Sequence, residues 1–422
     1  MQGEQIKAQI EQEVEGHREA IIAAVQDLVR IDTVVPKEGA GQRYMADLYR
    51  DLGLGLDIFE VDRAEVEKHP AYVPVPWDYS GRPNVVGTLN GEEGARSLIL
   101  NGHVDVVSPE PLSEWRRDPF GAVIDGGRLY GRGGNDMKAG LIANYWALKS
   151  VLLAGFRPRG TVQLQSVIEE EAGGAGTLAC FLRGHKADGM VISEPSPSAV
   201  VASAGVVYFR VTVLGKTAHA GLAHLGVNAI GKMYQIYDDL VAWDAERAAS
   251  LRYPLFEDLV GRSCHLVPGK LSAGVWISTV AGSAVLECRM SFIPGEDRQD
   301  IYRQVRERVA NVADRDDWLR EHPPAVEFFG WQADPWEQDP SHPFVVAFRE
   351  NAARVWDRPI ALAGKAAGLD TRFAQFWGVP ALTFGPVGGN HHGIDEWVDV
   401  ESIITLTKTL ASFIVEWSGW RE

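Results

Sequence analysis

The sequence predicts an α/β fold, with a mostly parallel sheet flanked by helices and interrupted by a smaller ferredoxin-like α+β domain. Two observations support this prediction. From about residue 84, short apolar runs alternate with longer helical patterns, as in parallel sheets that helices cover on both faces. Between about 201 and 335 the order becomes strand, helix, strand, strand, helix, strand, which is the ferredoxin-like order. We therefore expect one domain from residues 1–200 and 336–422, and an inserted domain from residues 201–335.

The first domain begins with an amphipathic helix, because apolar residues recur there at helical spacing. These residues are Ile21, Val25, Leu28 and Val29. The apolar runs expected to form strands are 97–100, 161–168, 189–192 and 381–384. Residues 137–155 have a helical pattern that ends at Gly155, a residue typical of helix C-termini. A last helix has an apolar face made of Ile403, Leu406, Leu410 and Phe413.

The inserted domain is expected to begin with a strand at 206–215 and a helix at 226–243. Four residues, Ile230, Met233, Tyr237 and Leu240, form the expected apolar side of that helix. Residues 275–295 are interpreted as two strands that turn near Ala281 and Gly282. A second helix over 297–312 and a strand over 325–331 complete the pattern.

Composition excludes several classes of protein. The chain has 422 residues and a formal net charge of −16, whereas a nucleic-acid-binding protein needs a basic face. No apolar stretch reaches the roughly 18–20 residues of a membrane span, and the polar, acidic start is unlike a secretory signal. Three widely spaced cysteines do not form a disulfide framework. We expect a cytoplasmic protein with no nucleic-acid or membrane partner.

Histidine and carboxylate residues follow the expected strands of the first domain, where open α/β sheets bind their ligands. They are His103, Asp105, Glu169, Glu170, Glu171, Glu194, His391, His392 and Glu396, and Asp136 precedes the helix of 137–155. Imidazole and carboxylate are the ligands of zinc and related divalent ions. A pair of such ions needs a bridging carboxylate, and hydrolysis needs a further carboxylate that takes a proton from water.

Local spacing adds detail to this metal-site hypothesis. His103 and Asp105 are two residues apart in an extended segment, so their side chains share a face and Asp105 can orient the imidazole. Glu170 and Glu171 are neighbours, so their side chains diverge and one can bind metal while the other faces water. Taken singly, His103 has a structural alternative, Asp136 is a candidate helix N-cap, and Glu169–Glu171 resembles a solvated acidic face. Their joint placement favours one shared site.

Competing chemistries have weaker support. The sequence contains no G-x-S-x-G, H-E-x-x-H or C-x-x-C motif, and the best P-loop candidate has Arg210 where a glycine is required. A glycosidase that uses the carboxylates of Glu169–Glu171 would leave His103 and His392 without a role. A binding module that lost its activity is a third alternative, but no expected ligand or base is substituted.

Six motifs resemble a known family and occur in its order. They are NGHVDVV (101–107), GRLYGRGGNDMKAG (127–140), IEEEAGGAGT (168–177), SEPS (193–196), GKTAHAG (215–221) and HHGIDEWV (391–398). Over nearly its whole length the chain resembles the acetylornithine deacetylase and succinyl-diaminopimelate desuccinylase family. These two-metal amidohydrolases also include aminoacylases and glutamate carboxypeptidases.

The resemblance implies a role for each motif residue. His103 and Glu194 would bind one metal ion, Glu171 and His392 the other, and Asp136 would bridge them, with a cis peptide bond before Met137. Glu170 would be the general base and Asp105 the carboxylate behind His103. The first domain would be the metallohydrolase domain and the inserted one a lid and dimerisation domain. From a homodimer, His219 would reach the partner subunit's site and stabilise the oxyanion. Zinc is the expected ion, with cobalt and manganese as alternatives.

The resemblance also implies hydrolysis of a linear C–N amide bond in a small molecule. An N-acyl amino acid or a related N-acyl or N-formyl amine is the expected substrate, and an N-formyl aminopyrimidine or an aromatic amine is the alternative. Arg289 and Arg372 are candidates for binding a substrate carboxylate, although Arg372 can instead pair with Asp370. Ser278 stands where relatives commonly have a substrate-contacting asparagine.

Overall fold

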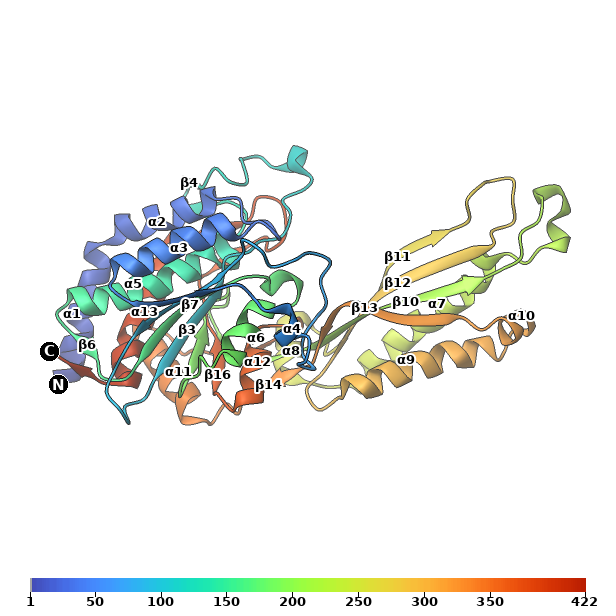
Figure 1. The fold of residues 1–422 in the computed structure, drawn as a ribbon. Coiled ribbons are helices and arrows are strands. Elements are labelled where there is room, and N and C mark those ends of the chain that lie inside the picture. Colours follow the sequence, from blue (N-terminus) through green and yellow to red (C-terminus); the bar gives the residue numbers. More distant parts are fainter. Residues whose placement is uncertain (1) are drawn as a thin grey trace. The chain divides into compact units, whose positions relative to one another are not determined.

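Two compact units make up the computed structural model of this protein, which describes residues 2–422, with the side chains of residue 2 and of 258–260 excepted. The first unit contains the chain up to Val201 together with Gln338–Ala363 and Asp370–Glu422. The second contains Ala202–Glu337 and a short return segment, Gly364–Leu369. The predicted fold class, a helix-flanked α/β sheet with a smaller separate sheet, is confirmed (Figure 1).

The large sheet is parallel at its centre and antiparallel at its edges. Its strands, in spatial order, are β1 (Gly55–Phe59), β2 (Asn84–Leu89), β7 (Val162–Val167), β3 (Leu98–His103), β8 (Met190–Ile192), β16 (Ala381–Thr383), β9 (Ala199–Ser203) and β14 (Trp336–Glu337), and β15 (Leu362–Lys365) pairs with β9. The four central strands β7, β3, β8 and β16 pair in parallel. These four strands are the runs predicted from the sequence, and their carboxyl ends lie at one edge of the sheet.

Helices cover both faces of this sheet. On one face α1 (Gln2–Gly16), α2 (Arg18–Arg30), α5 (Ala139–Leu153) and α13 (Val400–Ser418) pack together (Figure 1). Neighbouring residues of β3 show that α6 (Ala175–Leu182) lies on the other face, since successive side chains in a strand point to opposite sides. The amide of Asn101 donates to Thr177 of α6, whereas a Cβ on Gly102 would meet Leu141 of α5.

A smaller sheet brings two distant segments of the first unit together. It contains β17 (Gly388–Gly389), β18 (Trp397–Asp399), β5 (Arg128–Tyr130) and β4 (Val123–Asp125). Trp397 of β18 is paired with Tyr130 of β5. The segment after β5 carries Asp136, and the segment between β17 and β18 carries His392, so this pairing places both near the large sheet's strand ends.

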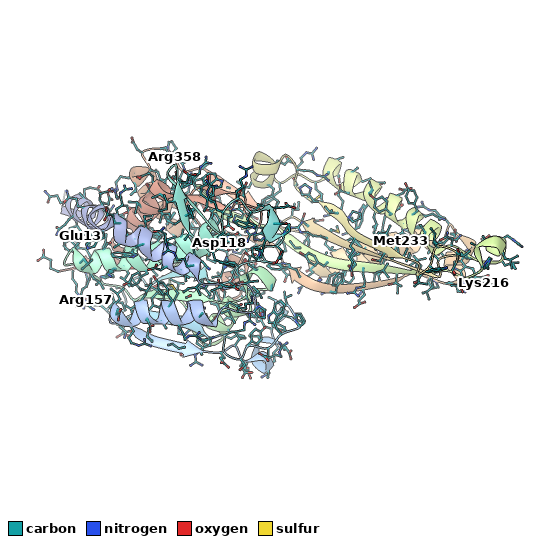
Figure 2. All side chains as sticks on the ribbon, turned by 90° about the horizontal axis from the view of Figure 1, so that it is seen from above. Glu13, Asp118, Arg157, Lys216, Met233 and Arg358 are labelled. Atoms are coloured by element: carbon teal, nitrogen blue, oxygen red, sulfur yellow. The ribbon has the colours of Figure 1, made fainter. Side chains whose placement is uncertain are left out.

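The second unit has the predicted ferredoxin-like order. Its elements are β10 (Gly205–Leu214), α7 (Ala229–Ser250), β11 (Leu266–Ala273), β12 (Ser283–Phe292), α9 (Arg298–Ala313) and β13 (Ala325–Ala333). The strands form an antiparallel sheet in the order β11-β12-β10-β13, and α7 and α9 pack on it (Figure 1). Met233, on the buried side of α7, is labelled in Figure 2.

Two details of the second unit differ from the prediction. The first strand of the predicted pair is wrong, because β11 ends at Ala273 and residues 274–282 form the connection to β12. Val275, Trp276 and Ile277 form an apolar run typical of a strand, yet Val275 and Ile277 are 93% and 95% exposed and lie outside the strands of the described residues. Ile230, expected on the apolar side of α7, is 46% exposed because the buried face runs through Ala229, Met233, Ile236 and Leu240, and Ile230 is rotated about 100° away from it.

The remaining elements are shorter or peripheral. They are α3 (Gly39–Asp51), α4 (Arg63–Val66), α8 (Pro254–Val260), α10 (Asp317–Glu321), α11 (Pro343–Val355), α12 (Thr371–Ala374), β6 (Arg157–Pro158) and β19 (Trp420–Arg421). Among residues 2–422, no helix combines the length and hydropathy that crossing a bilayer requires. The three cysteines Cys180, Cys264 and Cys288 are buried thiols.

Candidate metal and catalytic site

The parallel strands of the large sheet bring three predicted site residues together. His103 is the last residue of β3 and pairs with Val167 at the end of β7. Glu170 follows β7, and Glu194 follows β8. The potential ligand atoms of His103, Glu170 and Glu194 all lie within 4.8 Å of one another, and the three residues are buried. An imidazole nitrogen and two carboxylates in this arrangement suit a divalent cation.

A second group shares His103 and adds Asp136 and Glu171, again with ligand atoms within 4.8 Å of one another. Asp136 lies between two imidazoles. Its Oδ1 is 3.3 Å from His103 Nε2, and its Oδ2 is 3.6 Å from His392 Nε2. His392 Nε2 is also 3.0 Å from a carboxylate oxygen of Glu171. The peptide bond between Asp136 and Met137 is cis.

Asp105 connects the histidine to the two glutamates. Its carbonyl oxygen is 2.9 Å from His103 Nδ1, whereas its carboxylate is 3.6 Å from that nitrogen. The carboxylate accepts the backbone N–H groups of Glu170, at 3.2 Å, and of Glu171, at 3.0 Å. The buried Asp105 side chain therefore fixes the turn that aims both glutamates, a role that spacing alone did not indicate.

Glu169, the first glutamate of the run, is also buried rather than solvated. Glu169 adopts a positive φ of 67°, and its carboxylate accepts hydrogen bonds from Trp77 Nε1 at 2.9 Å and Tyr79 Oη at 3.1 Å. Arg82 Nη2 lies 3.5 Å from the same carboxylate and also pairs with the buried Glu38. These partners leave no signal in the sequence, because the segment that contains Trp77 and Tyr79 has no periodic pattern.

The crowded carboxylates show why a cation fits this site. Burial and the nearby charges of Glu194 and Asp370 raise the pKa of Glu170 well above its usual range. Hydrogen bonds to Asp136 and Glu171 raise the pKa of His392 to about 10. Acidic groups held this close repel one another, and a divalent cation among them offsets that repulsion. The set of nitrogen and oxygen donors fits zinc, cobalt and manganese.

The remaining predicted residues have different surroundings. Arg372 is buried in the first unit, where Nη2 donates to the Gly173 carbonyl at 2.6 Å and Nη1 lies 3.5 Å from Asp370. Arg289 belongs to the second unit, and its Nη2 donates to the Ala366 carbonyl at 3.3 Å. His219 also belongs to the second unit, where its Nδ1 accepts the backbone N–H of Gly221 at 3.1 Å.

Comparison with known proteins gives concordant matches. Residues 99–416 match the model of the peptidase family M20/M25/M40. An N-formyl-4-amino-5-aminomethyl-2-methylpyrimidine deformylase from Bacillus subtilis (strain 168) is 29% identical, over 97% of this chain and 97% of the relative. A succinyl-diaminopimelate desuccinylase from Alkalilimnicola ehrlichii is 26% identical, over 90% of this chain and 94% of its own. The solved di-peptidase Dug1p from Saccharomyces cerevisiae shares the fold, with a TM-score of 0.76, 16% identity and 98% of each chain covered.

Proposed function

This chain belongs to the peptidase family M20/M25/M40 and is a metal-dependent amidohydrolase, and on that premise we propose that it removes the formyl group of an N-formylated aminopyrimidine. The observation that carries the hydrolytic reaction is the convergence of Asp136, Glu170, Glu171 and Glu194 around His103. The substrate class is supported by the relative of that activity, which aligns over 97% of this chain.

We propose that two divalent ions, with zinc as the expected metal, bind in this cluster. His103 and Glu194 would hold one ion, Glu171 and His392 the other, and Asp136 would contact both. The position of Asp136 between the two imidazoles supports this division. When bound, the ions supply Lewis acidity, which lowers the pKa of water and polarises a carbonyl group.

The protein's own part in the reaction centres on Glu170. Its carboxylate takes the proton of the attacking water and then passes it to the leaving nitrogen. The hydrogen bond from its backbone N–H to Asp105 keeps the side chain in place between the two steps.

We propose that the second unit acts as a lid and makes a homodimer, in which His219 completes the site of the partner subunit. Its exposed apolar residues support an interface there, because large exposed apolar surfaces usually mark interaction sites. They are Leu222, Leu225, Val275, Trp276 and Ile277.

Subunit complementation tests this dimer. His219→Ala and Glu170→Ala each inactivate the enzyme on their own, but mixing the two variants under exchange creates heterodimers with one intact site. Random pairing gives about a quarter of the wild-type activity. No recovery on mixing, or full activity of a monomer in sedimentation, would contradict the role of His219.

A hydrolysis screen tests the substrate class. Metal-loaded enzyme is assayed against an N-formyl aminopyrimidine, N-succinyl and N-acetyl amino acids, and an aromatic amine, with Glu170→Gln as the inactive control. The desuccinylase relative makes an N-succinyl amino acid the second candidate. Arg289→Ala separates the two, because loss of a carboxylate-binding group reduces kcat/KM only for substrates that carry a carboxylate. Absence of bound metal together with activity that resists chelators would refute the hydrolase mechanism.

A further inference from the structure

One buried carboxylate, that of Glu396, accepts hydrogen bonds from the segment that carries Asp136. Oε1 accepts the backbone N–H groups of Asn135 and Asp136, both at 3.1 Å. Oε2 accepts the backbone N–H of Gly133 at 3.0 Å and Nη1 of Arg132 at 2.7 Å. Four donors therefore converge on a side chain that is 1% exposed, and three of them belong to the backbone that leads into Asp136.

Arg132 extends this network to the segment that carries His392. Its Nη2 donates to the Gly393 carbonyl at 3.0 Å, and that residue directly follows His392. Arg132 is also buried, and its guanidinium lies over the Trp115 ring, 5.2 Å from the ring centre. The Glu396–Arg132 pair thus contacts both the segment that carries Asp136 and the segment that carries His392.

The segment that carries His392 needs such external contacts. Asn390, His392 and Asp395 all have positive φ values, of 58°, 57° and 54°. Residues other than glycine seldom adopt this conformation unless the surrounding structure holds them in it. The network contacts this segment at Gly393, which directly follows His392, and at Glu396, which directly follows Asp395.

From this geometry we infer that Glu396, together with Arg132, is a positioning residue that holds the bridging carboxylate of Asp136 and the imidazole of His392 at the spacing that binds the metal pair. Glu396 touches neither substrate nor metal and acts through the backbone on which these two ligands stand. The inference rests on the proposed function, since it assigns Asp136 and His392 as ligands. Groups that orient metal ligands typically change metal affinity by roughly 10–100-fold.

Metal binding, rather than activity alone, provides the test. Metal-free wild type and Glu396→Gln are titrated with zinc chloride by calorimetry, and the bound metal is counted by elemental analysis. Glutamine retains the volume of the Glu396 side chain but replaces one acceptor oxygen with an N–H₂ group. That group then faces either the N–H donors of Asn135 and Asp136 or those of Gly133 and Arg132, and it cannot accept their hydrogen bonds. We expect zinc affinity to fall roughly 10–100-fold and kcat to fall with little change in KM.

A matched control and a second variant complete the design. Glu296→Gln removes a partly buried carboxylate of the second unit that binds Arg247 and the N–H of Ile293, and it should leave zinc affinity unchanged. Arg132→Lys retains the charge but cannot reach both Glu396 and Gly393, and a smaller loss of affinity is expected. If circular dichroism shows that Glu396→Gln does not fold, the zinc affinity of Arg132→Lys tests the positioning role instead.

The outcomes are distinguishable. Wild-type zinc affinity in both Glu396→Gln and Arg132→Lys overturns the inference, and so does an equal loss in Glu296→Gln. Failure of the wild-type protein itself to bind zinc, cobalt or manganese overturns the proposed function instead. Loss confined to the two variants of the network, with Glu296→Gln unaffected, supports the positioning role.

Discussion

Metal binding to the metal-free protein should release protons into solution. Hydrogen bonds to Asp136 and Glu171 raise the pKa of His392 to about 10. The pKa of His103 is raised well above its usual range, because the neighbouring carboxylates of Asp136 and Asp105 outweigh the effect of burial. Both imidazoles therefore carry a proton at neutral pH when no metal is bound. A histidine binds metal only in its neutral form, so each must lose that proton.

The expected magnitude follows from these values. At pH 8 a group with a pKa of about 10 is protonated in about 99 of 100 molecules. Binding at His392 should therefore release about one proton, and binding at His103 should add to this number. For each proton released, the apparent metal affinity should rise about tenfold when the pH is raised by one unit, as long as the pH stays below the histidine pKa.

Calorimetry in several buffers measures this release directly. Metal-free protein is titrated with zinc chloride at pH 8 in buffers that differ in ionisation enthalpy, and the slope of the observed heat gives the number of protons. His392→Gln should lower that number by about one. Binding heats that are independent of the buffer, or the same slope in His392→Gln and wild type, would refute the reasoning.

Three further predictions concern catalysis and stability. Glu170→Gln should lower kcat roughly 10²–10⁴-fold while metal content by elemental analysis stays at the wild-type level; retained activity would contradict the general-base role. Asp105→Ala removes the acceptor of two N–H groups, the buried one of Glu170 and the partly buried one of Glu171. At about 1–3 kcal/mol each, the free energy of unfolding in urea should fall by about 2–6 kcal/mol, whereas a loss below 1 kcal/mol would argue against this contribution. Asp316 caps α10 and pairs with Lys232 of α7. Burial by itself would raise the pKa of Asp316, but the hydrogen bonds to Lys232 and to the backbone lower this pKa from 3.8 to about 2. Its stabilisation is present above the unfolded-state value and is lost as the pH falls toward 2. Asp316→Ala should therefore cost about 1 kcal/mol at pH 7 and progressively less below pH 4, as measured by urea unfolding across that range.

The fold was predictable where burial and periodicity agree. The runs that became β3, β7, β8 and β16 are apolar because central strands are covered on both faces, and this pattern is visible without a structure. The segment 275–280 misled the prediction because it begins with the apolar run Val275, Trp276 and Ile277, which is typical of a strand, although all three residues are exposed. A run of β-branched and aromatic residues favours a strand, but it does not say whether the rest of the same chain covers those side chains.

The candidate site was predictable in composition but not in its supporting contacts. Residues such as His103 and Glu194 stand directly after apolar runs, so topology alone predicts their proximity, and the structure brings them together. Their division between two ions stays a prediction. The backbone contacts of Asp105 and the Trp77–Glu169 hydrogen bond depend on the path of irregular segments. Such contacts leave no periodic signal, because a loop is positioned by whatever lies next to it in space.

The junction at which the chain enters and leaves the main segment of the second unit, Ala202–Glu337, has an evolutionary consequence. Ala202 and Glu337 are partners in the β9–β14 ladder, so the two ends of the intervening chain lie about one strand spacing, roughly 5 Å, apart. A two-residue hairpin turn closes such a ladder as readily as a whole folded body does, and the entropy of closing a loop grows only slowly with its length. Recombination at this point can exchange one insert for another of different size and chemistry, while the sheet that carries His103 and Glu194 keeps its strand order.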